Sequence, residues 1–203
     1  MKVAIIRYNA GNVQSVLYAL QRLGIDAIVT GDHDEIKAAD KVIFPGVGHA
    51  SSAMDYLKEK GLDKLIISLQ QPVLGICLGL QLLCNFSEEG NTKCLGVFNA
   101  AVKKFDDSVF QNKNLVPVKI PHMGWNTIEH LSSLLMEGVS ENAYVYFVHS
   151  YYAELSKETI ATTDYIHPFS SAMHKNNFYG VQFHTEKSAE AGEIILSNFL
   201  KIK

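Results

Sequence analysis

The chain has 203 residues, of which 47% are hydrophobic and 19% charged, and its formal net charge is −3. This length predicts one domain, residues 1–203, with enough apolar residues to form a full core. The sequence has neither a basic run nor an apolar run of about 18 residues, which argues against nucleic-acid binding and membrane insertion. The three cysteines, at 77, 84 and 94, form no CxxC pair, and with no signal peptide we expect a cytoplasmic setting.

The first half of the chain alternates between two hydrophobic patterns. Short apolar runs predict buried strands at 3–6, 25–29, 41–44 and 73–76, and helical spacing predicts helices at 13–23, 34–39, 54–69 and 80–86. The third of these helices is expected to break near Gly61. Such alternation predicts an α/β fold, a doubly wound and mostly parallel sheet with helices on both faces.

The second half is richer in strand patterns separated by short turns. Strands are predicted at 97–105, 125–129, 143–148, 159–163, 171–174 and 178–183, and a polar loop at 111–119. Their clustering predicts antiparallel additions to the parallel core. Ser188 is the expected N-cap of a terminal helix whose inward stripe is Ala191, Ile194, Ile195 and Phe199.

Cys77 lies where the fourth predicted strand meets a helix, with Gly75 and Gly79 two residues to either side. A strand that turns sharply into a helix strains its corner residue and projects that side chain above the sheet. Cysteine thus occupies the serine position of a nucleophile elbow, where the positive end of the helix dipole favours a thiolate. The alternative is a buried structural cysteine on a tight turn.

Eight histidines are candidates for the base that serves Cys77. His184 and His149 each end an apolar run, but only His184 has a carboxylate, Glu186, two residues on. In an extended segment residues i and i+2 point to the same side, so Glu186 is predicted to orient His184. His149 is interpreted as structural and His49 as close to the site. The remaining three that we assign are expected at the surface: His33, His130 and His167.

The segment Gly46-Val47-Gly48 follows the third predicted strand. Neighbouring parallel strands share one crevice at their carboxyl ends, so this loop is expected to meet the Cys77 elbow. An oxyanion there would have two backbone donors, the N–H of Leu78 and that of Val47 or Gly48. The alternative is an ordinary strand-to-helix turn.

The segment from Gly75 to Gln81, together with the segment from Val181 to Glu186, resembles the class I glutamine amidotransferases. Three further stretches, which begin at Tyr8, Phe44 and Pro121, are similar to glutaminase subunits that serve histidine biosynthesis. The resemblance runs from Lys2 to about Ser188. It implies that Cys77 attacks the glutamine carboxamide, that His184 moves the proton, and that Glu186 orients His184.

The resemblance also implies the surroundings of the site. Four residues match positions that hold the amino-acid head of glutamine: Gln81, Glu89, Ser150 and Tyr151. No metal and no cofactor is expected. The implied partner is a TIM-barrel cyclase subunit that receives ammonia through an internal passage, with Asn12, Trp125, Tyr146 and Lys187 at the junction. The isolated chain is expected to hydrolyse glutamine poorly.

One departure from the family concerns Thr185, which stands where proline is usual between histidine and glutamate. Threonine favours extended geometry, so we expect the alignment of the pair to survive. Three alternatives stay open. In the first, the chain is a glutaminase subunit for pyridoxal phosphate or anthranilate synthesis. In the second it is another cysteine acyl hydrolase, and in the third a non-enzymatic binding module with Cys77 buried.

Overall fold

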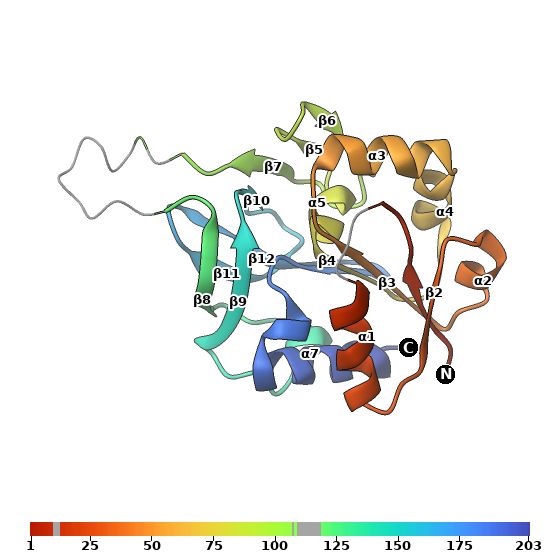
Figure 1. The fold of residues 1–203 in the computed structure, drawn as a ribbon. Helices are drawn as coiled ribbons and strands as arrows, with labels where there is room; N and C mark the ends of the chain where they lie inside the picture. The colour runs from red at the N-terminus through yellow and green to blue at the C-terminus, as the bar shows by residue number, and fades with distance from the viewer. Residues whose placement is uncertain (10–12, 107, 109–118) are drawn as a thin grey trace.

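The structure is a computed structural model that describes residues 1–9, 13–106, 108 and 119–203. Its centre is a parallel sheet of five strands in the order β2 (Ala27–Thr30), β1 (Val3–Ile6), β3 (Lys41–Gly46), β4 (Val73–Cys77) and β13 (Phe178–Val181) (Figure 1). The strands are short and apolar, and β1, β3, β4 and β13 are buried along their whole length. This is the pattern of strands covered on both faces, and the doubly wound α/β prediction is confirmed.

Antiparallel strands extend the sheet beyond β13, as predicted. They are β12 (Pro168–Lys175), β11 (Thr159–Asp164), β10 (Tyr151–Ala153), β7 (Ala101–Lys104), β5 (Phe86–Ser87) and β6 (Thr92–Lys93), with only the β5–β7 pair parallel. The strands β8 (His122–Ile128) and β9 (Ala143–His149) form a separate antiparallel pair.

The strand predicted at 97–105 is wrong in its first half, because only 101–104 pairs as β7. The N–H groups of Val97 and Phe98 both bond to the carbonyl of Leu83. The apolar residues before β7 therefore close the end of a helix instead of extending a strand. The loop predicted at 111–119 falls on residues of which 111–118 lie outside the described part of the chain.

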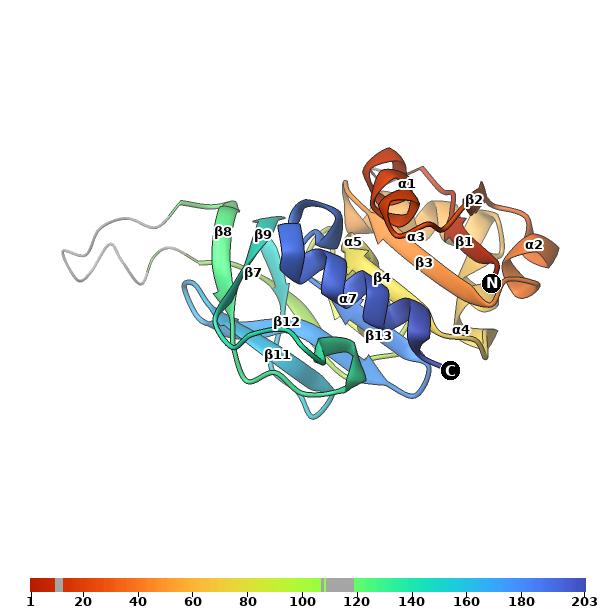
Figure 2. The same ribbon diagram turned by 90° about the horizontal axis from the view of Figure 1, so that it is seen from below.

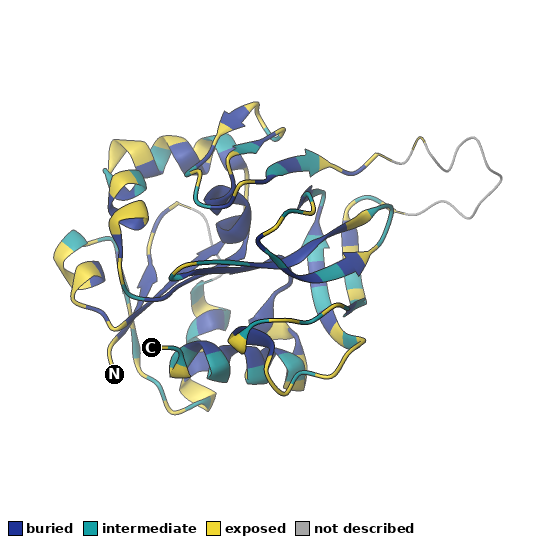
Figure 3. Ribbon diagram, turned by 180° about the vertical axis from the view of Figure 1, so that it is seen from behind, coloured by how far each residue is buried: buried dark blue, intermediate teal, exposed yellow. Residues whose placement is uncertain are grey.

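Helices cover both faces of the parallel sheet (Figure 2). The helices α1 (Val13–Arg22) and α7 (Ala189–Lys201) lie on one face, and α2 (His33–Lys37), α3 (Ala50–Glu59), α4 (Leu62–Ser68) and α5 (Leu78–Leu83) on the other. Each layer encloses its own hydrophobic core, so the sheet strands are buried while the outer helix faces are exposed (Figure 3). No helix in the described ranges is long and apolar enough to span a bilayer.

One local prediction needs correction in the terminal helix. Leu196, not Ile194, completes the buried stripe of α7, because the helix turns Ile194 towards its half-exposed side. Ser188 holds the N-cap position, but its hydroxyl makes no cap bond. It accepts from the Tyr146 N–H at 3.0 Å and donates to the His184 carbonyl at 2.6 Å.

The break between α3 and α4 at Gly61, where φ is +66°, is confirmed.

The strand register brings three separate segments to one edge of the sheet. Gly46, the last residue of β3, pairs with Cys77, the last residue of β4. Ile76 pairs with Val181, which ends β13 three residues before His184. The Val47–Gly48 loop, the Cys77 corner and the His184 segment therefore leave the sheet side by side at the carboxyl ends of their strands.

Candidate active site

Cys77 is a strained corner between β4 and α5, as the elbow interpretation predicts. Its φ is +54° and its ψ is −110°, and α5 begins at the next residue. The glycines on either side permit the close approach that this turn needs. A Cβ on Gly79 would overlap the Phe44 carbonyl oxygen, and one on Gly75 would lie 2.8 Å from the Gly79 carbonyl carbon. The backbone here admits no larger residue without movement.

His184 and Glu186 form a buried pair, with Nδ1 and Oε1 2.7 Å apart. The geometric reason given from the sequence is wrong, because the two residues do not share an extended strand. His184 has extended backbone, but Thr185–Lys187 forms a 3-10 turn, η2, that folds Glu186 back onto the imidazole. Thr185 is compatible with this turn, so the alignment persists without the proline.

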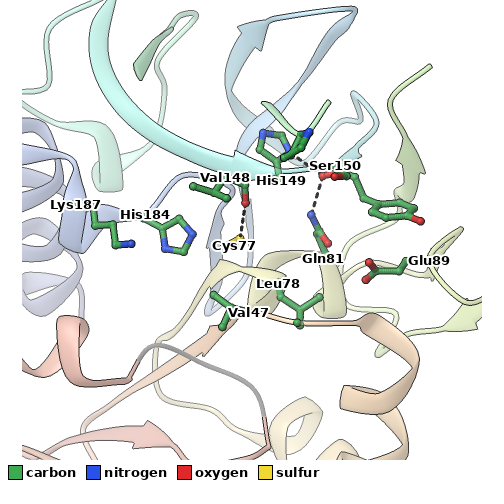
Figure 4. Close-up of a pocket in the computed structure, with 13 residues that line it drawn as sticks. Val47, Cys77, Leu78, Gln81, Glu89, Val148, His149, Ser150, His184 and Lys187 are labelled. Carbon is green, nitrogen blue, oxygen red and sulfur yellow. Dashed lines mark hydrogen bonds between the residues drawn. The ribbon is translucent and has the colours of Figure 1, made fainter. Parts of the chain in front are cut away.

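Burial alone would lower the pKa of His184, but its interactions with the Cys77 thiol and the Glu186 carboxylate outweigh burial and raise that pKa to about 10. The imidazole therefore favours its protonated form while both partners are in place. In Figure 4 the ring of His184 lies beside Cys77, with Lys187 on the side of the ring away from Cys77. An imidazolium next to a sulfur stabilises thiolate, which is the nucleophilic form of cysteine.

Cys77 and His184 both line a pocket of about 530 Å³. The same pocket contains every residue that the sequence assigned to substrate or oxyanion binding: Val47, Gly48, Leu78, Gln81, Glu89, Ser150 and Tyr151. Pro121, Val148, His149 and Lys187 complete its wall. Within the described ranges, no three His, Cys, Asp or Glu side chains are grouped as metal ligands.

Gln81 anchors one side of the pocket through its amide group. Its Nε2 donates to the carbonyl of Tyr151 at 2.8 Å and to the side-chain oxygen of Gln182 at 2.9 Å. Gln182 in turn donates from Nε2 to the sulfur of Cys77 at 3.7 Å, while the thiol points to the Val148 carbonyl at 3.8 Å. The α5 helix, the Tyr151 segment and Cys77 are thus held in one network.

Gln182 was missed at the sequence level, although a signal was present. It is a fully buried polar residue inside the apolar run 178–183. A buried amide must find hydrogen-bond partners, so an amide in this apolar run indicates specific polar neighbours. In the structure those neighbours are Gln81 and Cys77, which both line the pocket.

Glu89 reaches the pocket from the turn before β6 (Figure 4). One carboxylate oxygen, Oε2, accepts from the N–H of Ala50 at the start of α3, at 2.7 Å. This bond ties the Glu89 side chain to the start of α3. A negative group at this wall favours a cationic group on a bound molecule.

His149 lies in the pocket wall but is a buried, neutral residue, in agreement with its structural interpretation. Burial lowers its pKa to about 3, and burial also lowers the pKa of the neighbouring His122 to about 4. His49 accepts at Nδ1 from the Ser51 N–H at the start of α3 and does not line the pocket. The three histidines assigned to the surface, His33, His130 and His167, also lie outside the pocket. His130 is exposed and the other two are half-buried.

The other two thiols differ from Cys77 in their surroundings. Cys84 and Cys94 are buried in the α3–α5 core, and neither lines the pocket. Burial raises the pKa of both thiols, which disfavours their thiolate forms. All three cysteines are free.

The proposed junction residues form a continuous surface in the described part of the chain. Trp125 is 52% exposed and its ring centroid lies 5.9 Å from that of Tyr146. The Lys187 ammonium lies 5.8 Å from the Tyr146 ring centroid, and Lys187 also lines the pocket. The surface therefore leads from β8 to the pocket that Cys77 lines. Asn12, the fourth residue assigned to the junction, lies outside the described residues.

Comparison with known proteins finds relatives that match along the whole chain. The family model described as glutamine amidotransferase class-I matches residues 4–202. A protein of Bacteroides fragilis (strain YCH46), named imidazole glycerol phosphate synthase subunit HisH, is 58% identical over 100% of both chains. A protein of the same name from Shewanella loihica is 46% identical and covers 98% of this chain and 89% of its own length.

Solved structures give the same fold at low sequence identity. The crystal structure of a glutamine amidotransferase superposes with a TM-score of 0.72 at 17% identity, and covers 98% of this chain and 97% of its own. A glutamine amidotransferase from Thermotoga maritima gives a TM-score of 0.64, also at 17% identity, over 99% of this chain and 83% of its own. At this identity the agreement concerns the fold alone.

Proposed function

The chain belongs to the class I glutamine amidotransferases, and we propose that its pocket hydrolyses glutamine as the glutaminase subunit of imidazole glycerol phosphate synthase. The observation that carries this proposal is the meeting of Cys77, His184 and Glu186 at one edge of the sheet. A nucleophile, a base and an orienting carboxylate are the parts of an acyl-transfer site.

We propose the following chemistry for these groups. The Cys77 thiolate attacks the side-chain carboxamide carbon of glutamine. The C–N bond breaks as His184 passes a proton to the departing nitrogen, which leaves as ammonia. The acyl group stays on Cys77 as a thioester. His184 then removes a proton from water, which attacks the thioester and releases glutamate. Glu186 holds Nδ1 of His184 throughout, so that the other ring nitrogen faces the reacting atoms.

The negative oxygen formed in each step needs hydrogen-bond donors. We assign one to the N–H of Leu78, the first residue of α5, and the second to the N–H of Val47 or Gly48. Removal of one such donor typically costs about 2.7–4 kcal/mol of transition-state stabilisation. Both segments border the pocket because β3 and β4 end in register at Gly46 and Cys77.

The amino-acid head of glutamine is assigned to the far wall. The Glu89 carboxylate is suited to the α-ammonium group, and the Ser150 hydroxyl and the Tyr151 segment to the α-carboxylate. Gln81 fixes this wall by its bond to the Tyr151 carbonyl. The carboxamide would then point along the pocket towards Cys77.

The partner is proposed to be a TIM-barrel cyclase subunit that consumes the ammonia. The relatives are named as subunits of a synthase, which supports a partner. The β8–β9 pair supplies an apolar surface for it, since Met123, Trp125 and Tyr144 are each more than half exposed. Large exposed apolar groups of this kind are typical of interaction sites. We place the junction at Trp125, Tyr146 and Lys187.

A reducing cytoplasmic setting is part of the same proposal and is supported by the three free cysteines. A glutaminase subunit for pyridoxal phosphate or anthranilate synthesis would keep this fold and this pocket but dock another protein. A general cysteine acyl hydrolase would keep Cys77 and His184 but would have no use for Glu89 in the pocket.

The test is a glutaminase assay of the wild type and of Cys77→Ser, each with and without a candidate cyclase subunit. We expect glutamate formation by the wild type, strongest with the partner present, and none above background for Cys77→Ser. Turnover of a simple ester without turnover of glutamine contradicts the amidotransferase function. Recovery of a pyridoxal or anthranilate synthase component in a pull-down, with no cyclase, contradicts the choice of partner.

A further inference from the structure

His122 and His149 form a buried chain that has no role in the chemistry above. His149 Nδ1 lies 2.7 Å from the carbonyl oxygen of Tyr151, and its Nε2 lies 3.0 Å from His122 Nδ1. The Nε2 of His122 lies 3.3 Å from the amide nitrogen of Asn126. Both imidazoles are almost completely buried.

Only one set of tautomers satisfies this chain. The carbonyl of Tyr151 can only accept, so Nδ1 of His149 must carry a proton and its Nε2 must accept. His122 Nδ1 must therefore donate to His149, and its Nε2 must accept from Asn126. Each imidazole is neutral in this arrangement, in agreement with the depressed pKa that burial gives both. His122 thus fixes the tautomer of His149.

His122 is itself held rigidly. Its ring stacks between two aromatic rings, with centroid distances of 3.8 Å to Tyr165 and 4.7 Å to Phe147. Such packing leaves the imidazole little freedom to rotate or to change which nitrogen faces His149.

The hydrogen bonds that run through His122 and His149 end at the wall of the pocket. The Tyr151 carbonyl accepts from His149 on one side and from Gln81 Nε2, at 2.8 Å, on the other. Two donors on one carbonyl fix the peptide group that follows Tyr151, and so restrain the adjoining Ser150–Tyr151 segment, which lines the pocket. This deepens the proposed function, because that wall is where we place the head of glutamine.

We propose that His122 and His149 are positioning residues for glutamine: His122 fixes the Nδ1–H tautomer of His149, which holds the Ser150–Tyr151 wall in place. Neither residue reaches the reacting atoms in this role. Loss of the hydrogen bonds between His122, His149 and Tyr151 should weaken glutamine binding and leave the reactivity of Cys77 unchanged. Asparagine and glutamine substitutions distinguish the roles of the two ring nitrogens. An asparagine amide nitrogen can take the place of Nδ1, and a glutamine amide nitrogen can take the place of Nε2.

The experiment compares the full chain in complex with its cyclase partner as wild type, His122→Asn, His122→Gln, His149→Gln and a control, His174→Gln. His174 is matched to the pair, since its Nε2 bonds to the Asn176 carbonyl and its ring stacks on Tyr179, but it does not line the pocket. Three quantities are measured: KM and kcat for glutamine, the rate of Cys77 alkylation by iodoacetamide, and the protection that glutamine gives against it.

We expect His122→Gln and His149→Gln to raise KM and the half-protecting glutamine concentration about tenfold, the equivalent of about 1.4 kcal/mol. The kcat and the iodoacetamide rate should stay within about threefold of wild type, and His122→Asn and His174→Gln should behave as wild type. An unchanged KM for His122→Gln, equal effects of His122→Asn and His122→Gln, or a parallel fall of kcat and alkylation overturns the inference. If the wild type shows neither glutamine turnover nor protection, the proposed function fails and this inference with it.

Discussion

The Nδ1 of His184 and the Oε1 of Glu186 lie 2.7 Å apart, and both side chains are almost fully buried. The turn η2 sets this distance, because it folds the chain back one residue after His184. The carboxylate has no other described hydrogen-bond partner for Oε2, so its principal contact is the imidazole. The pair is therefore a unit whose two members can be tested separately.

Glu186→Gln should lower kcat more than it raises KM. The amide can hold the ring but cannot stabilise the imidazolium that forms during proton transfer, and loss of such a carboxylate lowers kcat by about 10⁴-fold in a serine protease triad. Here we expect a loss of about 10²–10⁴-fold in steady-state glutamine hydrolysis. A kcat within threefold of wild type would show that Glu186 does not serve His184 in the reaction.

The pH dependence of stability follows from His184. Its pKa rises from 6.5 in the unfolded chain to about 10 in the fold, so protonation stabilises the folded state. This stabilisation is complete below pH 6.5 and is lost as the pH rises through about 10. Urea unfolding of the wild type and of His184→Gln at pH 6, 8 and 10 should show a stability difference that shrinks at each step. A constant or growing difference contradicts the raised pKa.

Gly79→Ala should destabilise the fold and abolish activity. A Cβ at Gly79 would overlap the Phe44 carbonyl oxygen, which forces α5 away from β3 and displaces Cys77. Overpacking of this kind costs about 1–3 kcal/mol or more. Gly31→Ala is the matched control, because its Cβ would meet only the Arg7 oxygen, at 3.2 Å. Equal midpoints of thermal unfolding for the two variants would refute this explanation.

Ser188→Ala should weaken both stability and catalysis. The hydroxyl links the Tyr146 N–H on β9 to the His184 carbonyl, and its removal leaves a buried donor unpaired at a cost of about 1–3 kcal/mol. His184 keeps the bond from its N–H to the Tyr146 carbonyl but loses the second link to β9, through the Ser188 hydroxyl, so kcat should fall while KM changes little. Ser197→Ala on the same helix, half-buried, is the control and should match the wild type in urea unfolding and in turnover.

The parallel half of the fold and the Cys77 corner were predictable because their signals are local. Apolar runs of strand length and a cysteine flanked by Gly75 and Gly79 specify buried strands and a sharp turn without reference to distant residues. The meeting of Cys77 with His184 was also predictable in outline, since parallel strands place their carboxyl ends at one edge of the sheet.

The parts that escaped prediction depend on distant contacts. The stretch before β7 has strand-like residues, but its N–H groups bond to Leu83. Thr185 gives no sign of the η2 turn, because its residue type favours extended backbone, and the Ser188 that follows the turn bonds to Tyr146 on the distant strand β9. The pairing of His122 with His149 joins β8 to β9 across 27 residues, and no spacing rule indicates it.

Covalent labelling with a diazoketone analogue of glutamine, read by mass spectrometry of peptides, tests whether Cys77, His184 and the proposed glutamine-binding wall act as one site. The reagent needs both that wall and a reactive sulfur beside a proton donor. We expect one adduct, on Cys77, that excess glutamine suppresses and that His184→Gln slows strongly, with Cys84 and Cys94 unmodified. Equal labelling of the three cysteines, or no adduct on Cys77, would contradict this expectation.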